Sequence, residues 1–141
     1  MDELGEAIIP TTDTPGAKAT EIGAFMVMMV TDTYNAEQQQ SFVDGLNLLR
    51  KDFKKATGKD FMAVNVEERT AYLNELKAAG KASVDAPAEL VPTILGMLQD
   101  LTVLGYFTSE IGATQQLRFV EAPGRYDACI DYTPGDRVFA L

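Results

Sequence analysis

Apolar residues recur at helical spacing along most of this chain, and this period constrains its fold more than any other feature. Between positions 35 and 58, the residues Phe42, Leu46, Leu49 and Phe53 follow one another in steps of four, three and four. Such steps place apolar side chains on one face of an α-helix. The sequence therefore predicts an all-α protein: a compact bundle of about five helices with an extended C-terminal tail.

Turn and cap residues set the expected helix boundaries. The expected helices span residues 2–9, 20–33, 35–58, 65–80 and 88–107. Thr20 is expected to cap the second helix, and the pairs Asn35/Gln38 and Asn65/Glu68 match capping boxes for the third and fourth. Gly58 and Gly80 suit helix ends, and Pro87 suits a first turn.

Proline and glycine also shape the expected loops and helix contacts. Pro10 should end the first helix, and Pro15-Gly16 suits a type II turn in the loop over residues 11–17. Gly96 and Gly105 lower the stability of the last helix. Their presence suggests that another backbone approaches closely, which we expect at both residues.

The second helix and the C-terminal tail both suggest contact with another chain. Residues 22–30 are apolar on every face, which predicts burial on more than one side. Thr108-Ser109-Glu110 can start a short helical turn. Residues 118–141 then combine turn formers with isolated apolar side chains and lack a core of their own. We expect one helical domain over residues 1–141, with 118–141 as an extended tail that wraps a partner.

Composition excludes several classes of protein. The 141 residues are enough for one domain. They include no histidine, so histidine-based triads, dyads and haem ligation are excluded, and any catalysis would rest on carboxylate, Lys, Tyr or Cys129 chemistry. Cys129 is the single cysteine, so no internal disulfide can form. The sequence predicts no catalytic residue, no bound cofactor and no metal in this chain.

Charge and hydropathy bear on partners. The net charge is −9, with 21 acidic and 12 basic residues, which disfavours nucleic acid and anionic membrane surfaces. The most apolar run, residues 22–30, is far shorter than the roughly 20 residues of a membrane-spanning helix. We therefore expect no direct membrane insertion.

Three clusters have both a functional and an ordinary interpretation, and the ordinary one is favoured for each. A basic cluster in the third helix and just beyond it could dock an acidic surface, or could be a solvated face near a helix C-terminus. Methionines with Cys129 could bind Cu(I), or could fill a core. Three aspartates of the tail could bind Ca²⁺, or could form turns. The residues are Arg50, Lys51, Lys54, Lys55 and Lys59; Met26, Met28 and Met29; and Asp127, Asp131 and Asp136.

The segment Gly124-Arg125-Tyr126-Asp127 has two interpretations of equal weight. Arg and Tyr are residue types that anchor interfaces, so the segment could bind a partner. It could equally be an ordinary turn with an exposed arginine.

Two stretches carry long, unusual motifs. Residues 8–18 read IIPTTDTPGAK, and residues 104–118 read LGYFTSEIGATQQLR, followed by PGRYDAC at 123–129. In these motifs, and in their order and separation, the chain resembles the gluconate 2-dehydrogenase subunit 3 family.

The resemblance implies a non-catalytic small subunit that assembles with a large FAD-dependent dehydrogenase of the glucose-methanol-choline oxidoreductase type, stabilises it and helps its export. Substrates in such complexes are sugars, sugar acids or glycosides, and electrons leave through a cytochrome subunit or another acceptor. The resemblance places FAD in the large subunit and the complex in the periplasm. The sequence shows no leader before Met1-Asp2-Glu3, and we expect that a leader was removed. A cytoplasmic location stays open. The alternative function is a free-standing helical adaptor or binding module.

The two motif regions are expected to lie close together and to form the surface that contacts the large subunit. Glu110 is expected as the buried partner of an arginine, and Cys129 as buried at the interface or bonded to the large subunit. The expected interface residues are Pro15, Gly16, Tyr106, Ser109, Glu110, Gly112, Arg118, Arg125, Tyr126, Asp127 and Cys129.

Overall fold

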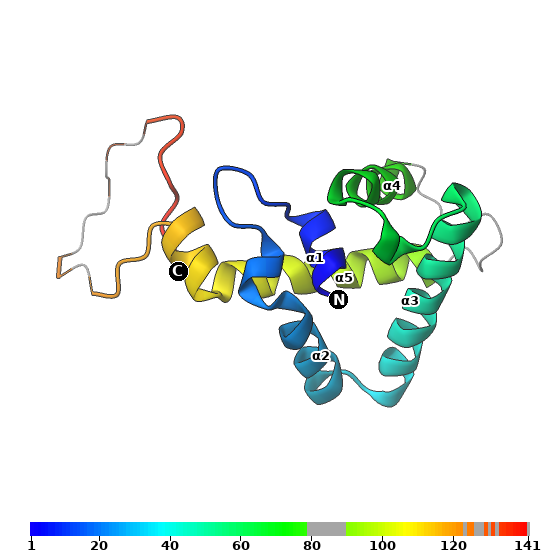
Figure 1. Cartoon of the computed structure of the whole chain (residues 1–141). Helices are drawn as coiled ribbons and strands as arrows, with labels where there is room; N and C mark the ends of the chain where they lie inside the picture. The colour runs from blue at the N-terminus through cyan, green and yellow to red at the C-terminus, as the bar shows by residue number, and fades with distance from the viewer. Residues whose placement is uncertain (79–89, 123, 126–128, 130, 132, 141) are drawn as a thin grey trace.

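Five α-helices of at least seven residues form the body of the computed structural model, which confirms the all-α prediction (Figure 1). The structure describes residues 1–78, 90–122, 124, 125, 129, 131 and 133–140. For residues 90–93 it describes the backbone only. The helices are α1 (Asp2–Ile8), α2 (Ile22–Thr33), α3 (Ala36–Thr57), α4 (Val66–Ala78) and α5 (Leu90–Thr108). Two 3-10 turns, Ala17–Thr20 and Phe61–Ala63, and a π-helical turn, Gly112–Gln116, connect or extend them.

Local capping explains both ends of α3. The Asn35 side chain accepts from the Gln38 amide, and the Gln38 side chain accepts from the Asn35 amide, so the predicted capping box of α3 is confirmed. Gly58 ends α3 with φ 71°, a left-handed conformation that glycine adopts at little cost. The predicted ends at Gly80 and Pro87 lie outside the described residues.

The predicted cap of α2 is wrong by one residue. Thr20 lies in the preceding 3-10 turn, where its hydroxyl donates to the carbonyl of Ala17 at 2.7 Å. The helix begins at Ile22, after Glu21 in a left-handed conformation with φ 54°. The extra 3-10 turn satisfies the threonine hydroxyl locally and moves the start of α2 towards the C-terminus.

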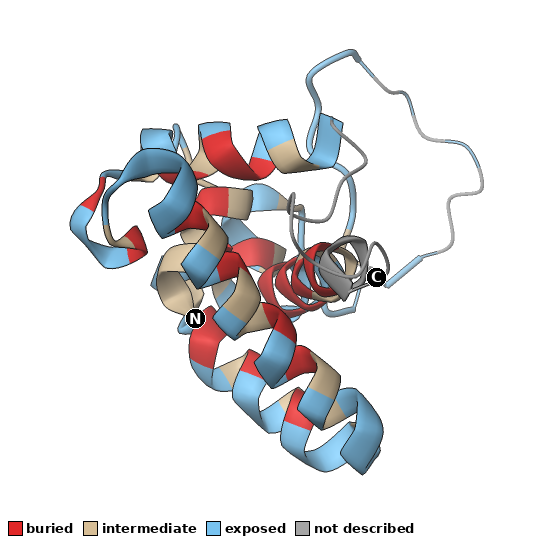
Figure 2. Ribbon diagram, turned by 90° about the vertical axis from the view of Figure 1, so that its right-hand side faces the viewer, coloured by how far each residue is buried: buried red, intermediate tan, exposed pale blue. Residues whose placement is uncertain are grey.

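The core forms where α1, α2 and α3 pack against α5 and where α4 packs against α1; Figure 1 shows α5 running behind α1. The α5 residues Ile94, Leu98 and Leu101 are buried, as the helical period predicts. On the α3 side, Phe53 stands edge-on to Phe61 and Tyr72, with ring centroids 5.0 and 4.9 Å apart. Figure 2 shows buried residues along the inner sides of the helices.

Only one side of α2 is buried within this chain. Ile22, Met26 and Val30 belong to the core, whereas Val27 and Met28 are 57% and 51% exposed. The predicted contact of α2 with α5 is confirmed, no further described helix covers the other side, and its burial by a partner stays a prediction. α2 packs against α1 and α5, and no other described element covers its outer face.

The two glycines of α5 have different surroundings. A Cβ at Gly105 would lie 2.5 Å from both Ile22 Cδ1 and Phe25 Cδ1, so α2 approaches closely there through its side chains and not, as was predicted, through its backbone. At Gly96 no heavy atom of the described residues outside the local helix backbone lies within 4 Å of such a Cβ, so no described element makes the predicted close approach there.

The described residues of the C-terminal segment contain no helix beyond Gln116 and are largely exposed. Figure 1 shows the segment leaving the end of α5 and returning towards it. Arg118 and Phe139 form an isolated parallel bridge, in which Arg118 donates to Val138 O at 2.8 Å and accepts from Ala140 N at 3.0 Å. The Arg118 guanidinium lies over the Phe139 ring, 4.7 Å from its centroid.

Candidate functional site: the 10–16 loop and the end of α5

The two motif regions of the sequence meet in the structure. The Tyr106 hydroxyl on α5 donates to the carbonyl of Pro15 at 2.7 Å, and the Thr14 hydroxyl donates to Gln116 Oε1 at 2.6 Å. These contacts join residues 91 and 102 positions apart in the chain. We call the surface formed by residues 10–16 and 109–116 the loop platform.

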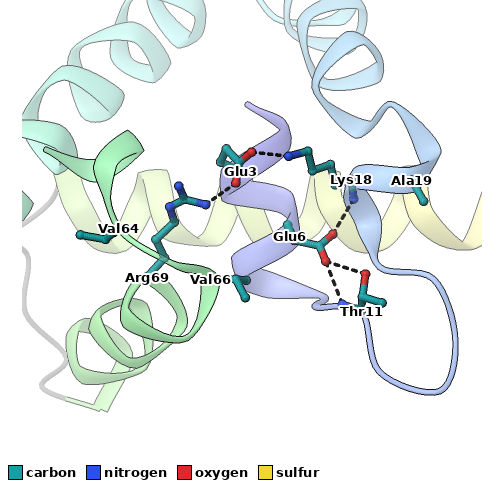
Figure 3. Close-up of a pocket in the computed structure, with 8 residues that line it drawn as sticks. All are labelled: Glu3, Glu6, Thr11, Lys18, Ala19, Val64, Val66 and Arg69. Carbon is teal, nitrogen blue, oxygen red and sulfur yellow. Dashed lines mark hydrogen bonds and ion pairs between the residues drawn. The ribbon is translucent and has the colours of Figure 1, made fainter.

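A carboxylate of α1 holds the other side of the loop (Figure 3). Glu6 Oε1 accepts from the amide and hydroxyl of Thr11 at 2.9 and 2.7 Å, and Glu6 Oε2 accepts from the amide of Lys18 at 2.9 Å. Glu6 and Thr11 are not among the interface residues predicted from the sequence. No local pattern marks a glutamate four residues before Pro10 as the acceptor for amides of the following loop.

The base of the loop is closed, and Gly16 is buried within it. The amide of Ala17 donates to Ile9 O at 2.9 Å, and the amide of Gly16 donates to the hydroxyl of Thr11 at 3.0 Å. Gly16 has φ −78°, whereas a type II turn needs a positive φ after Pro15. The predicted type II turn is therefore wrong, because Gly16 is extended in the segment that leads into the 3-10 turn.

The α5 end of the platform is held by its own hydrogen bonds. The Ser109 hydroxyl donates to Tyr106 O at 2.7 Å and accepts from the Gly112 amide at 3.0 Å. A Cβ at Gly112 would overlap the Tyr106 carbonyl, so only glycine fits this turn. Ser109 and Gly112 thus fix the path of the chain from α5 into the π-helical turn.

The remaining predicted interface residues differ in exposure. Tyr106 is only 1% exposed, so it supports the platform from inside the core. Glu110 is exposed in this chain, and its burial against an arginine at the interface stays a prediction. Arg118, Arg125 and Cys129 are exposed in this chain. Tyr126 and Asp127 lie outside the described residues.

A charged hollow of about 570 Å³ lies beside the loop, between α1 and α4 (Figure 3). Arg69, 5% exposed, donates to Phe61 O at 2.8 Å and is paired with Glu3. Glu3 is also paired with Lys18. The hydrogen bond from Lys18 lowers the pKa of Glu3, burial opposes this, and the charge of Arg69 lowers it further. The sequence analysis missed the Glu3–Arg69 pair, whose members lie 66 positions apart.

The other candidate clusters have ordinary surroundings. Met26 is buried in the core and Met28 is half-exposed, so the two do not converge. Among the described residues, no three His, Cys, Asp or Glu side chains gather as a metal site would require. The basic cluster is exposed, and two of its members form ion pairs at 3.0 Å, Arg50 with Asp60 and Lys59 with Glu68.

None of the described helices is both long enough and apolar enough to cross a membrane.

The arrangement around the loop offers hydroxyls, amides and one carboxylate at an exposed surface, with Thr11, Thr12 and Asp13 all exposed. Such a surface is suited to hydrogen bonding with another molecule.

Comparison with known proteins identifies the family of this chain. The model of the family described as gluconate 2-dehydrogenase subunit 3 matches residues 1–124. No curated protein and no solved structure shows significant similarity to the chain. The match covers the helical body, the loop platform and the first part of the C-terminal segment. The chain therefore belongs to the gluconate 2-dehydrogenase subunit 3 family, whose members are subunits of a dehydrogenase complex.

Proposed function

We propose that this chain is a non-catalytic small subunit that assembles with, stabilises and helps export a large FAD-dependent dehydrogenase of the glucose-methanol-choline type. The substrate of the complex is a sugar, a sugar acid or a glycoside. The observation that carries the proposal is the family match over residues 1–124, with the two motif stretches meeting at the loop platform. A surface built from both stretches is the natural place for the shared partner of a family.

The proposed division of labour places the flavin and the catalytic base in the large subunit. The chain contains no histidine, the side chain most often used as a general base near neutral pH. A cytochrome subunit or another acceptor takes up the electrons, and the complex works in the periplasm. These last two features rest on the family resemblance.

In this proposal the partner surface consists of the loop platform and the tail over residues 118–141. The described tail residues are mostly exposed, including the apolar Phe119 and Val138. An isolated pair of extended segments is only marginally stable in water, so packing against a partner would stabilise it. Cys129 then becomes buried at the interface or bonded to the large subunit.

The test is purification of the tagged chain from its source organism, with mass spectrometry of co-purifying proteins and a flavin absorbance scan. The complex should contain a large flavoprotein and be yellow. The chain produced alone should be colourless and should not reduce a dye with glucose or gluconate. A yellow isolated chain, or dye reduction by it, would refute the proposal. A well-behaved monomer that captures no flavoprotein would support the adaptor alternative.

A further inference from the structure

The loop over residues 10–16 is held at both of its ends by one carboxylate. Thr11, at the start of the loop, donates twice to Glu6, and the amide of Lys18, just after the loop, donates once. A carboxylate has room to accept several hydrogen bonds, and bonds to a charged acceptor are stronger than bonds to a neutral one. Glu6 therefore connects the two ends of the loop to α1.

Gly16 fits this arrangement because it has no side chain. A Cβ at Gly16 would lie 2.5 and 2.6 Å from the two carboxylate oxygens of Glu6 and 2.5 Å from the backbone nitrogen of Thr11. Its φ of −78° is accessible to any residue, so the need for glycine comes from space and not from backbone angle. A side chain at position 16 would push the Glu6 carboxylate away from its three donors.

The charged side chains near Glu6 pair with Glu3, so the Glu6 carboxylate is free to accept hydrogen bonds from the loop. Glu3 of α1, Lys18 of the 3-10 turn and Arg69 of α4 line the same hollow, and both cations pair with Glu3. Burial alone would raise the pKa of Glu6. The hydrogen bonds from Thr11 and Lys18 outweigh burial, and the pKa lies below its ordinary value of 4.5. The carboxylate is thus charged at neutral pH.

The loop has a second, independent attachment on its α5 side. Tyr106 donates to Pro15 O, and Thr14 donates to Gln116. Loss of the Glu6 bonds would therefore loosen the loop without detaching it from the core. A loop that is ordered before binding costs less conformational entropy when a partner docks.

We propose that Glu6 is a positioning residue whose ionised carboxylate holds the 10–16 loop in its docking conformation, and that acid releases this hold. The inference rests on the proposed function, because docking of the large subunit is what the ordered loop serves. A protonated carboxyl carries its own donor and has fewer free acceptor positions, so it cannot satisfy all three donors equally well.

The test compares Glu6→Gln and Gly16→Ala with the wild type and with Glu75→Gln, a control on an exposed glutamate of α4. Amide hydrogen exchange on the isolated chain reports the loop directly. Protection factors at Thr11 and Lys18 should fall by about tenfold or more in both variants, because each loses hydrogen bonds to a charged group. Core amides and the control should stay unchanged. In the wild type the same two amides should lose protection as the pH falls below the Glu6 pKa, and in Glu6→Gln they should be insensitive to it.

Affinity for the large subunit is the second measurement. Both variants should bind it at least about tenfold more weakly than the wild type and the control. Unchanged protection at Thr11 and Lys18 would overturn the positioning role of Glu6, whatever the affinity. Lost protection with unchanged affinity would overturn the role of the loop in docking. If the wild-type chain itself fails to bind a large flavoprotein, the proposed function fails. The hydrogen-exchange data then still test whether the Glu6 carboxylate orders the 10–16 loop.

Discussion

Met26 and Met28 lie two residues apart in α2, but their surroundings differ. Met26 is fully buried, whereas Met28 is half-exposed. Met26→Ala should lower the free energy of unfolding by about 2–5 kcal/mol, because it leaves a cavity in the core. Met28→Ala is the matched control and should change it by less than about 0.5 kcal/mol. Urea denaturation followed by circular dichroism measures both, and equal losses would show that α2 is not packed as described.

Glu3 of α1 pairs with Arg69 of α4, and this pair makes the free energy of unfolding depend on pH. The pKa of Glu3 is lowered in the folded chain, so its contribution is present above its ordinary pKa of 4.5 and is lost as the pH falls through the folded value. Glu3→Gln removes the charge beside the buried Arg69 and should cost about 1–3 kcal/mol at pH 7. The variant should also lose part of its dependence on pH below 4.5. Thermal unfolding from pH 3 to 7 tests this, and parallel curves for variant and wild type would contradict it.

The residue-level contacts were the least predictable from sequence. Asn35 and Gln38 form a local capping box, whose spacing is visible in the sequence. The pairing of Glu3 with Arg69 depends on the packing of α1 against α4, which no local pattern specifies. Glu6 likewise serves amides of a loop whose path is set by contacts with α5. Glu110 lies on the exposed side of the turn after α5, so its predicted burial against an arginine depends on the partner.

Close contact between α2 and α5 depends on Gly105. A side chain there would meet Ile22 and Phe25, so Gly105→Ala should destabilise the chain by about 1–3 kcal/mol through overpacking. The same substitution at Gly96 meets no neighbouring side chain or other element among the described residues and should stabilise α5 by about 0.5–1 kcal/mol, since alanine favours helix. Chemical denaturation of the two variants gives the comparison. A stabilised Gly105→Ala would show that the two helices are not in close contact.

The helices themselves were largely predictable, and the exceptions have physical reasons. The apolar period of α3 and the glycine at its end gave its bounds to within a residue. The start of α2 was misplaced because Thr20 bonds within a 3-10 turn. The two-sided burial of α2 was expected from its composition, but composition cannot distinguish a face buried in the core from one left exposed for another molecule.

At the scale of the whole molecule, the exposed apolar residues lie outside the shared core. The outer face of α2 and the C-terminal segment carry Val27, Met28, Phe119 and Val138 at the surface. In Figure 1 the loop platform lies between the C-terminal segment and α2. It is next to the end of α5, where the C-terminal segment begins. In the proposed complex, contact with the larger partner would cover this surface.

The most direct test is the dissociation constant of the large subunit for single alanine variants of this chain. Arg125→Ala and Tyr126→Ala should weaken binding by about 1–2 kcal/mol or more, because arginine and tyrosine anchor interfaces. Lys54→Ala and Lys55→Ala, in the exposed basic cluster of α3, should leave it unchanged. Weaker binding by the lysine variants, with tail variants that bind like the wild type, would contradict the account and place the docking surface on α3.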